Sequence, residues 1–483
     1  MQAMDVKRQA EDAAALLEAI AEDRRLLADL DPDLRQRLLI SAGRVSKPDK
    51  GARRALAREK RRRDKVEKRD TDRALLGRTE IRRLRDNPIF ETPRRRGEPL
   101  VEEPERRPPL GNVSDPRVCY VCRERYTTVH WFYDQMCVAC GDFNHDKRGQ
   151  TADLTGRVAL VTGGRVKIGY QSAIVLLRAG ARVLCTTRFP VDAAERFSRE
   201  EDFADWGDRL EIHGVDLRHT PSVEALCAQL VASHARLDFI VNNACQTVRR
   251  PPGFYEHLME KELGAGPSSE VHALVASQRT AVPVPSAALS QLRLLEEDRV
   301  DPTALFPLGK LDADLQQVDL RRVNSWRLKM HETSTVELLE VHLVNAVAPF
   351  VLNARLKPLM MAVPTADKHI VNVSAMEGQF YRTYKSDRHP HTNMAKASLN
   401  MMTRTSAADY VQHGIHMNSV DTGWVTDEDP AHHAARKRAQ DDFHPPLDIV
   451  DGAARILDPI LHGINSGEHI WGQFLKNYAP TDW

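Results

Sequence analysis

Val158-Ala-Leu-Val-Thr162-Gly163-Gly164-Arg165-Val166-Lys167-Ile168-Gly169 joins an apolar run to a glycine-rich turn. The apolar run predicts a buried strand, and the helical pattern Gln171–Arg178, closed by Gly180, follows the turn. Glycines allow backbone amides to approach a pyrophosphate, and the N-terminus of the following helix adds favourable partial charge. This stretch therefore predicts a strand, a phosphate-binding turn and a helix in direct succession.

The same alternation of apolar runs and helical patterns continues to the C-terminus. A second helix is predicted at Pro221–Ser233, with Thr220 as its N-cap. Strands that alternate with helices predict a parallel sheet covered on both faces, whose ligands bind beyond the carboxyl ends of the strands. The candidate strands are Val158–Thr162, Arg182–Thr187, Leu210–Asp216, Leu237–Asn242, His369–Ser374, His416–Asp421 and His469–Leu475.

Several of these strand ends resemble motifs of the short-chain dehydrogenase/reductase family. The turn is similar to the family's T-G-x-x-x-G-x-G, with Lys167 in place of the middle glycine. Asn242-Asn243-Ala244 resembles N-N-A-G, with Cys245 replacing the glycine, and Asp216 resembles the adenine-contacting aspartate. The resemblance implies an α/β fold, a Rossmann-like doubly wound parallel sheet over residues 151–483, that binds a nicotinamide dinucleotide. The coenzyme-binding residues it implies are Thr162, Gly163, Gly164, Arg165, Lys167, Ile168, Gly169, Arg188, Asp216, Leu217, Asn242, Asn243, Ala244, Lys396 and Thr426.

The end of the second strand indicates which coenzyme is preferred. Thr186-Thr187-Arg188 has no acidic residue to accept hydrogen bonds from a ribose 2′-hydroxyl, whereas an arginine fork suits a 2′-phosphate. We therefore expect NADP rather than NAD, the alternative being that Arg188 is an ordinary surface cation. Further along, Thr422-Gly423-Trp-Val-Thr426 resembles the P-G-x-x-x-T segment around the nicotinamide amide, with Thr422 replacing proline.

The catalytic residues of the family are only partly present. The resemblance places Asn345 on the long central helix, Ser374 at a strand end as the residue that orients substrate, and Lys396 in the Y-x-x-x-K motif. Thr392 stands where that motif has its tyrosine. A phenol has a pKa near 10 that its surroundings can lower, whereas an aliphatic hydroxyl is far too weak an acid to replace it.

A displaced proton donor is one way to restore the chemistry. Tyr384 and Tyr381 lie between Ser374 and Lys396, together with His389 and His391. We expect Tyr384 or Tyr381 to be the proton donor, with His391 as the next candidate. The alternative is that all of these are ordinary loop side chains.

Residues 248–334 form an insertion where the family has a short connection. The insertion contains Pro251-Pro252, Pro283 and Pro285, and one amphipathic piece at Leu289–Leu295. Because it follows Asn242-Asn243-Ala244, it should emerge beside the coenzyme and form a lid or a surface for a protein partner.

Two cysteine pairs precede the sheet, Cys119-Tyr-Val-Cys122 and Cys137-Val-Ala-Cys140. The β-branched and aromatic residues between them, 126–133, predict a small hairpin with each pair on a tight turn. Four thiolates satisfy tetrahedral Zn²⁺ and leave no open position, so a structural zinc site is expected in a module at 116–148. Buried or redox-active thiols are the alternative, and His130 or His145 would be substitute ligands.

The N-terminal part is charged and helical in pattern. Residues 1–87 are predicted to be helices, and 88–115 a Pro- and Arg-rich linker. Residues 51–96 hold 18 Lys/Arg against 8 Asp/Glu, so they are a weak candidate for nucleic-acid contact, with a solvated helix as the alternative. The whole chain is nearly neutral, with 69 Lys/Arg against 68 Asp/Glu, and carries no signal-peptide or membrane pattern. We therefore expect a cytoplasmic protein.

Together these features predict an NADP-dependent oxidoreductase with an altered active site. It would transfer a hydride to or from a small-molecule carbonyl, alcohol or imine, and the resemblance implies a homo-oligomer. The rival prediction is a non-catalytic dinucleotide-binding scaffold or sensor, whose zinc module and basic arm bind a protein or nucleic acid. That rival is favoured by the four departures from the family's motifs, at Thr392, Lys167, Cys245 and Thr422.

Overall fold

The computed structural model describes residues 2–94, 107–264, 269–276, 284–299, 301, 303–381 and 385–483. Tyr384, predicted as a proton donor, lies outside them, as do Pro283 and part of the predicted linker. The chain divides into two compact units, Met1–Asp72 and Arg73–Trp483. The first unit consists of charged helices, as the sequence predicts: α1 (Gln2–Glu22), α2 (Pro32–Ser46) and most of α3 (Lys50–Gly77).

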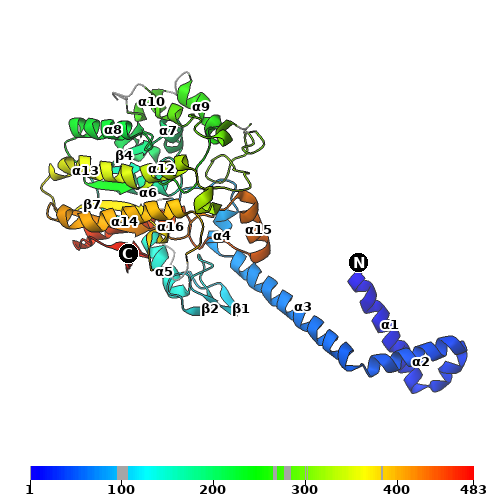
Figure 1. The fold of residues 1–483 in the computed structure, drawn as a ribbon. Helices are drawn as coiled ribbons and strands as arrows, with labels where there is room; N and C mark the ends of the chain where they lie inside the picture. The colour runs from blue at the N-terminus through cyan, green and yellow to red at the C-terminus, as the bar shows by residue number, and fades with distance from the viewer. Residues whose placement is uncertain are drawn as a thin grey trace. The chain divides into compact units, whose positions relative to one another are not determined.

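An eight-stranded sheet organises the second unit (Figure 1). Its order is β10-β9-β8-β7-β6-β3-β4-β5, and every pair is parallel except β10 with β9. The predicted Rossmann-like sheet is therefore confirmed. The strands are β3 (Val158–Thr162), β4 (Arg182–Thr187), β5 (Leu210–Gly214), β6 (Phe239–Asn242), β7 (Lys368–Ser374), β8 (Ile415–Asp421), β9 (Phe474–Lys476) and β10 (Ala479–Thr481).

The prediction for the last parallel strand was wrong at its start. A strand was expected from His469, but β9 begins at Phe474. Gly472 adopts a φ of +65°, which interrupts extended backbone, and Ile470 O accepts a hydrogen bond from the Asn418 side chain at 2.8 Å. The chain therefore enters the sheet only after this turn.

Helices cover both faces of the sheet (Figure 1). Successive residues of each strand point to opposite sides, so the apolar strands present a hydrophobic surface on each face. Ala159 and Val161 belong to one buried cluster, and Val158 and Leu160 to another. The first cluster contains residues of α6 (Lys167–Arg178), α7 (Pro190–Ser198) and α16 (Ile449–Ser466). The second contains residues of α8 (Thr220–Ser233), α13 (Ala348–Met361) and α14 (Pro390–Val411).

One helical stretch, Thr335–Met361, is long and apolar enough to cross a membrane by composition alone. It comprises α12 (Thr335–His342), a π-helical turn (Leu343–Val347) and α13. Leu352, Leu356 and Leu359 on this stretch are buried against the sheet. Core packing thus accounts for part of its apolar character, whereas Leu339, Phe350 and Met361 on the same stretch are exposed.

The cysteine-containing segment forms a hairpin followed by a helix. Strands β1 (Gly111–Val118) and β2 (Arg125–Val129) are antiparallel, and α5 (Val138–Arg148) follows them. Three expectations are corrected here. The hairpin expected within residues 126–133 is instead formed by β2 with β1, which precedes the first cysteine pair, and residues 130–137 form no strand. Residues 111–115, expected in an extended linker, belong to β1, in which Gly111 pairs with Val129 and Asn112 with Thr128 of β2. The second cysteine pair begins a helix rather than a turn, with Cys137 as its N-cap residue.

Buried polar contacts join this segment to α16 and to the preceding helix α4 (Glu80–Arg85). Tyr133 Oη donates to Asp451 at 2.6 Å, and Arg148 forms an ion pair with Asp448 at 2.5 Å. Arg82 of α4 pairs with Asp134 at 2.7 Å. The cysteine segment is therefore built into the second unit rather than tethered to it.

The insertion has its own small core and packs beside β4. Phe254, Tyr255 and Phe306 form a buried cluster with Phe189, which follows β4. Its helices are α9 (Glu256–Leu263), α10 (Ser269–Leu274) and α11 (Ser286–Leu289). The helical piece expected at Leu289–Leu295 is not formed, because Asp298 instead accepts hydrogen bonds from the amides of Leu294 and Leu295.

Candidate active site

A cavity of about 1230 Å³ lies at the carboxyl ends of the central strands. Strand β3 pairs with both β4 and β6, so the chain crosses in opposite directions on either side of it, and ligands of such sheets bind at this point. Of the predicted residues, the cavity is lined by Gly163, Arg165, Lys167, Ile168, Gly169, Arg188, Asp216, Leu217, Asn243, Ala244, Ser374, Lys396 and Thr426.

Four further predicted residues lie behind this lining and hold it in place: Thr162, Gly164, Asn242 and Asn345. Thr162 Oγ1 accepts a hydrogen bond from Ala244 N at 3.0 Å, and a Cβ on Gly164 would lie 2.5 Å from the sulfur of Cys185. Asn242 donates to Asn353 and Asn372 across the sheet. Asn345 Oδ1 accepts from the backbone amide of Gln246 at 2.8 Å.

The glycine-rich turn is tightly packed. Gly163 has a φ of +68°, and a Cβ on it would lie 2.9 Å from Ala244 Cα. A Cβ on Gly169 would lie 2.4 Å from Gly163 O. Both positions therefore require glycine, which leaves backbone rather than side chain facing the cavity.

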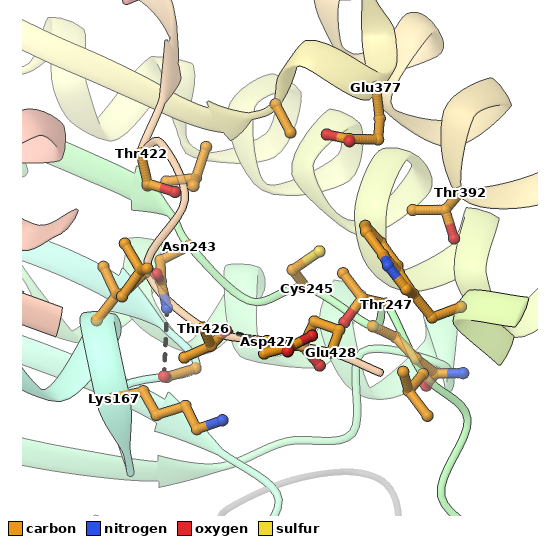
Figure 2. Close-up of a pocket in the computed structure, with 18 of the residues that line it drawn as sticks. Lys167, Asn243, Cys245, Thr247, Glu377, Thr392, Thr422, Thr426, Asp427 and Glu428 are labelled. Atoms are coloured by element: carbon orange, nitrogen blue, oxygen red, sulfur yellow. Dashed lines mark hydrogen bonds between the residues drawn. The ribbon is translucent and has the colours of Figure 1, made fainter. Parts of the chain in front are cut away.

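Lys167 occupies the place of the family's middle glycine and adopts the backbone conformation that glycine would take. Its φ is +55°, which a side-chain-bearing residue adopts at some cost. Burial alone would lower the pKa of the Lys167 ammonium, but the carboxylates of Glu428 and Asp314 raise that pKa above its ordinary value. Figure 2 shows Lys167 and Asn243 at one side of the pocket and Thr392 at the other, with Cys245, Thr247 and Asp427 between them.

Arg188 is held over the end of β4 by the insertion. Its Nη2 donates to the Tyr255 hydroxyl at 2.6 Å, and its guanidinium lies 4.5 Å from the Tyr255 ring centroid. Asp216, the predicted adenine contact, is paired with Arg218 at 2.6 Å. Tyr255 was missed in the sequence because its contact with Arg188 joins residues far apart in the chain.

Two buried hydroxyls face the other end of the cavity. Ser374 is 2% exposed and Thr392 is 1% exposed. Within the described part of the chain, neither hydroxyl has a hydrogen-bond partner. Lys396 also lines the cavity, and its Nζ donates to Val373 O at 2.7 Å. Unpartnered buried hydroxyls are costly, so this pair is suited to bonding a polar ligand atom.

Not all of the predicted proton donors lie at the end of the cavity where Ser374 and Thr392 are found. Tyr381 is 91% exposed and is not among the described residues that line the cavity. His391 is buried off the cavity, with Nε2 3.6 Å from Glu337 Oε1. His389, which lies in the same segment of the sequence, does line the cavity.

The insertion fixes the position of His389. The Trp326 and His389 rings are stacked with centroids 4.0 Å apart, and His389 N donates to Leu328 O at 2.7 Å. Pro390 begins α14 and disfavours helical geometry at the residue before it, and His389 adopts a φ of +40°. The His-Pro pair at the start of this helix is the sequence signal that could have identified it.

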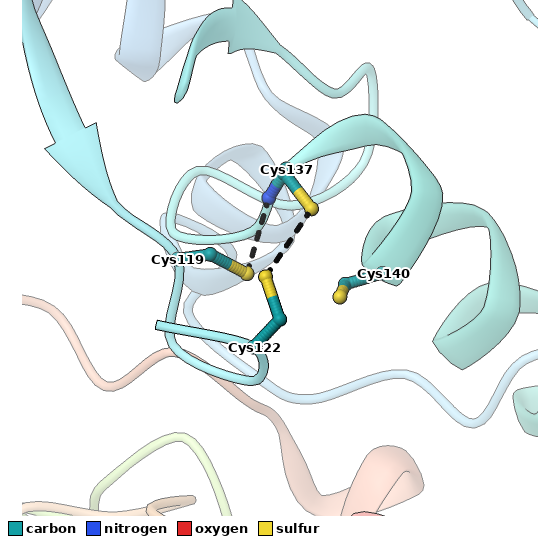
Figure 3. A group of neighbouring side chains, drawn as sticks. All are labelled: Cys119, Cys122, Cys137 and Cys140. Atoms are coloured by element: carbon teal, nitrogen blue, oxygen red, sulfur yellow. Dashed lines mark hydrogen bonds between the residues drawn. The ribbon is translucent and has the colours of Figure 1, made fainter. Parts of the chain in front are cut away.

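The four cysteines converge on one point (Figure 3). Their sulfur atoms all lie within 4.8 Å of one another, and those of Cys122 and Cys137 are 3.8 Å apart. Tetrahedral Zn–S bonds of about 2.3 Å would separate the sulfurs by about 3.8 Å, so the donor set fits zinc. Cys119 Sγ also accepts a hydrogen bond from Cys137 N at 3.4 Å, which favours the thiolate form.

Comparison with known proteins identifies the family. The description "short chain dehydrogenase" matches residues 157–263, and "Enoyl-(Acyl carrier protein) reductase" matches residues 317–445. An uncharacterized protein of Acanthamoeba polyphaga mimivirus is 31% identical over 376 residues, which are 74% of this chain and 74% of that protein. The protein belongs to the short-chain dehydrogenase/reductase family.

Matches to named enzymes are shorter. Retinol dehydrogenase 11 of Mus musculus is 32% identical over 115 residues, 23% of this chain and 36% of that protein. The match therefore spans about a third of that enzyme's length. Among solved structures, the Pseudomonas aeruginosa RhlG/NADP active-site complex is 19% identical, with a TM-score of 0.42, and covers 67% of this chain and 95% of that one.

Proposed function

We propose that the protein is an NADP-dependent oxidoreductase that transfers a hydride between the coenzyme and a carbonyl, alcohol or imine carbon. The observation that carries this proposal is the cavity itself. It brings the glycine-rich turn, Arg188, Ser374 and Lys396 to one space at the carboxyl edge of the sheet. The tight glycine contacts around Gly163 and Gly169 leave backbone amides to cradle a pyrophosphate.

Arg188 supports NADP as the coenzyme. Its guanidinium is oriented by Tyr255, and the last two residues of β4, Thr186 and Thr187, are not acidic. A fixed guanidinium fork suits the 2′-phosphate that distinguishes NADP from NAD. NAD binding would be weaker because it leaves this charge without its partner.

The substrate would bind where the two unpartnered hydroxyls lie. NADPH, when bound, would supply the hydride for the substrate carbon, and the substrate oxygen would then need a proton. Ser374 and Thr392 would donate hydrogen bonds to the substrate oxygen. Lys396 would bond the coenzyme ribose, and Asn345 would hold the neighbouring backbone through Gln246.

We assign the proton transfer to His389. Thr392 is too weak an acid, whereas imidazole is the side-chain group that most commonly donates and accepts protons in catalysis. Among the predicted alternatives Tyr381 points to solvent and His391 lies off the cavity, so His389 replaces them in this proposal. Tyr384 remains the competing donor, and the mutations described in the Discussion separate the two.

We further propose that the four cysteines hold a structural zinc ion, because all four donors are protein thiols and the set is closed. We also propose that the protein self-associates through α13 and α14. Helix α13 exposes Phe350 and Met361, and helix α14 exposes Met394 and Met401.

A non-catalytic coenzyme-binding role is the second candidate, and Thr392 in place of a tyrosine favours it. Incubating the zinc-loaded protein with NADPH and a panel of aldehydes, ketones and imines distinguishes the two roles. The oxidoreductase proposal predicts loss of absorbance at the wavelength of reduced nicotinamide with at least one substrate class. Tight NADPH binding without oxidation across the panel would support the non-catalytic role.

A further inference from the structure

The first turn of the cysteine cluster reaches the coenzyme cavity. Val118, Tyr120, Arg123 and Gln135 line the cavity together with the residues of the sheet edge. Tyr120 lies between Cys119 and Cys122, and its hydroxyl accepts a hydrogen bond from Trp424 N at 2.9 Å. A side chain of the metal-binding module therefore contacts the segment Thr422–Thr426, which follows β8.

This segment is shaped around the Tyr120 hydroxyl. Gly423 has a φ of +79°, and a Cβ on it would lie 2.9 Å from Tyr120 Oη and 2.5 Å from Leu447 Cδ1. Asp421 Oδ1 accepts a hydrogen bond from Gly423 N at 2.9 Å. Two successive amides of the segment are thus held, the first by Asp421 of the sheet and the second by Tyr120.

Tyr120 is itself held by the cluster. Its backbone amide donates to Gln135 O at 2.8 Å, and the amide of Cys119 donates to Glu124 O at 2.9 Å. Val425, which lines the cavity, and Leu447 belong to the same buried cluster as Cys119 and Met136. The module that carries the four cysteines therefore contacts the segment Thr422–Thr426 in two ways, through the Tyr120 side chain and through this shared apolar cluster.

We propose that Tyr120 is a positioning residue for the nicotinamide end of the coenzyme site. The cysteine cluster fixes Tyr120, and Tyr120 fixes Trp424 N and the segment up to Thr426. This inference rests on the proposed coenzyme function. It gives the metal-binding module a role in coenzyme affinity in addition to stabilising the fold.

The test compares Tyr120→Phe with Tyr126→Phe in the full-length, zinc-loaded protein. Tyr126 is a matched control because it belongs to the same module but its hydroxyl donates to Asp134 O at 3.0 Å, and it is not among the described residues that line the cavity. Two ligands are titrated by calorimetry: NADPH, and adenosine 2′,5′-bisphosphate, which lacks the nicotinamide half. Zinc content is measured for each variant.

Loss of one hydrogen bond predicts that Tyr120→Phe weakens NADPH binding about 3- to 10-fold. Its affinity for the bisphosphate and its zinc content should match those of the wild type, and Tyr126→Phe should bind both ligands normally. Equal weakening of both ligands would indicate a merely structural role and overturn the inference, as would unchanged NADPH binding. If the wild type binds neither ligand, the proposed coenzyme function itself fails.

Discussion

Trp326 is stacked on His389, with ring centroids 4.0 Å apart and ring planes 7° from parallel. Trp326 belongs to the insertion and His389 immediately precedes α14, so the insertion fixes an imidazole at the edge of the cavity. A bridge between Lys329 and Arg388 and a hydrogen bond from Arg388 to Arg327 O at 2.7 Å reinforce this contact. The insertion therefore takes part in building the site where the family's tyrosine is missing.

Replacing His389 tests its assignment as the proton donor. Asparagine tolerates the left-handed backbone of this position, so His389→Asn should fold normally while losing the imidazole. Loss of a general acid predicts a fall in kcat of about 10²-fold or more, with NADPH affinity unchanged. Steady-state kinetics on the most reactive carbonyl substrate would measure the change. Full activity in His389→Asn together with a large loss in Tyr384→Phe would assign the proton to Tyr384 instead.

Arg188 should determine coenzyme preference. A charge-assisted hydrogen bond to the 2′-phosphate is worth about 1.5–3 kcal/mol, so Arg188→Ala should weaken NADPH binding about 10- to 100-fold. NADH binding should change little, because NADH has no group at that position. Arg182→Ala is the control, since Arg182 is exposed at the opposite end of β4. Equal losses for both coenzymes, measured by fluorescence titration, would refute a 2′-phosphate contact.

Two substitutions at Lys167 separate backbone strain from charge. Lys167→Gly removes the cost of a φ of +55°, whereas Lys167→Ala retains that cost, and both remove the ammonium. The glycine variant should therefore be more stable than the alanine variant by about 1 kcal/mol in urea unfolding. Both should bind NADPH about tenfold more weakly if the ammonium contacts its phosphates. Equal stability of the two variants would contradict the strain inferred here.

A buried cluster of histidines predicts loss of stability in acid. His369 Nε2 is 3.0 Å from His469 Nδ1, and the His416 and His469 rings are 4.7 Å apart. Burial, reinforced by the two neighbouring histidines, holds the pKa of His369 well below its ordinary value of about 6.5. The unfolded chain therefore binds a proton first as the pH falls below about 6.5, and the free energy of unfolding decreases through that range.

The slope of this decrease is at most about 1.4 kcal/mol per pH unit for one proton. His369→Gln should flatten the dependence between pH 7 and pH 5 in denaturant titrations. The exposed residue His413 provides the control, and His413→Gln should retain the wild-type slope. A wild-type slope in His369→Gln would show that other groups dominate acid unfolding.

The sequence predicted those parts of the site that are local in the chain. Strand β3, the turn at Gly163 and helix α6 are consecutive, so their order could be predicted from one apolar run and its glycines, although α6 begins at Lys167 rather than at Gln171. The structure adds that Lys167 takes the left-handed conformation of the glycine it replaces.

Contacts between distant segments could not be predicted in this way. The pairs Arg188 with Tyr255, Trp326 with His389, and Tyr120 with Trp424 each depend on how the insertion or the cysteine module folds back on the sheet. Neither segment has a periodic pattern that specifies its partner. The start of α5 at the second cysteine pair was missed for a related reason, because Cys-x-x-Cys spacing fits a helix N-terminus as well as a turn.

Calorimetric titration of the zinc-loaded protein with NADPH tests whether the glycine-rich turn and Arg188 hold a coenzyme. We expect saturable binding of one NADPH per chain, with a higher melting temperature in its presence and weaker binding of NADH. Absence of both heat and thermal protection with NADPH and with NADH would contradict it.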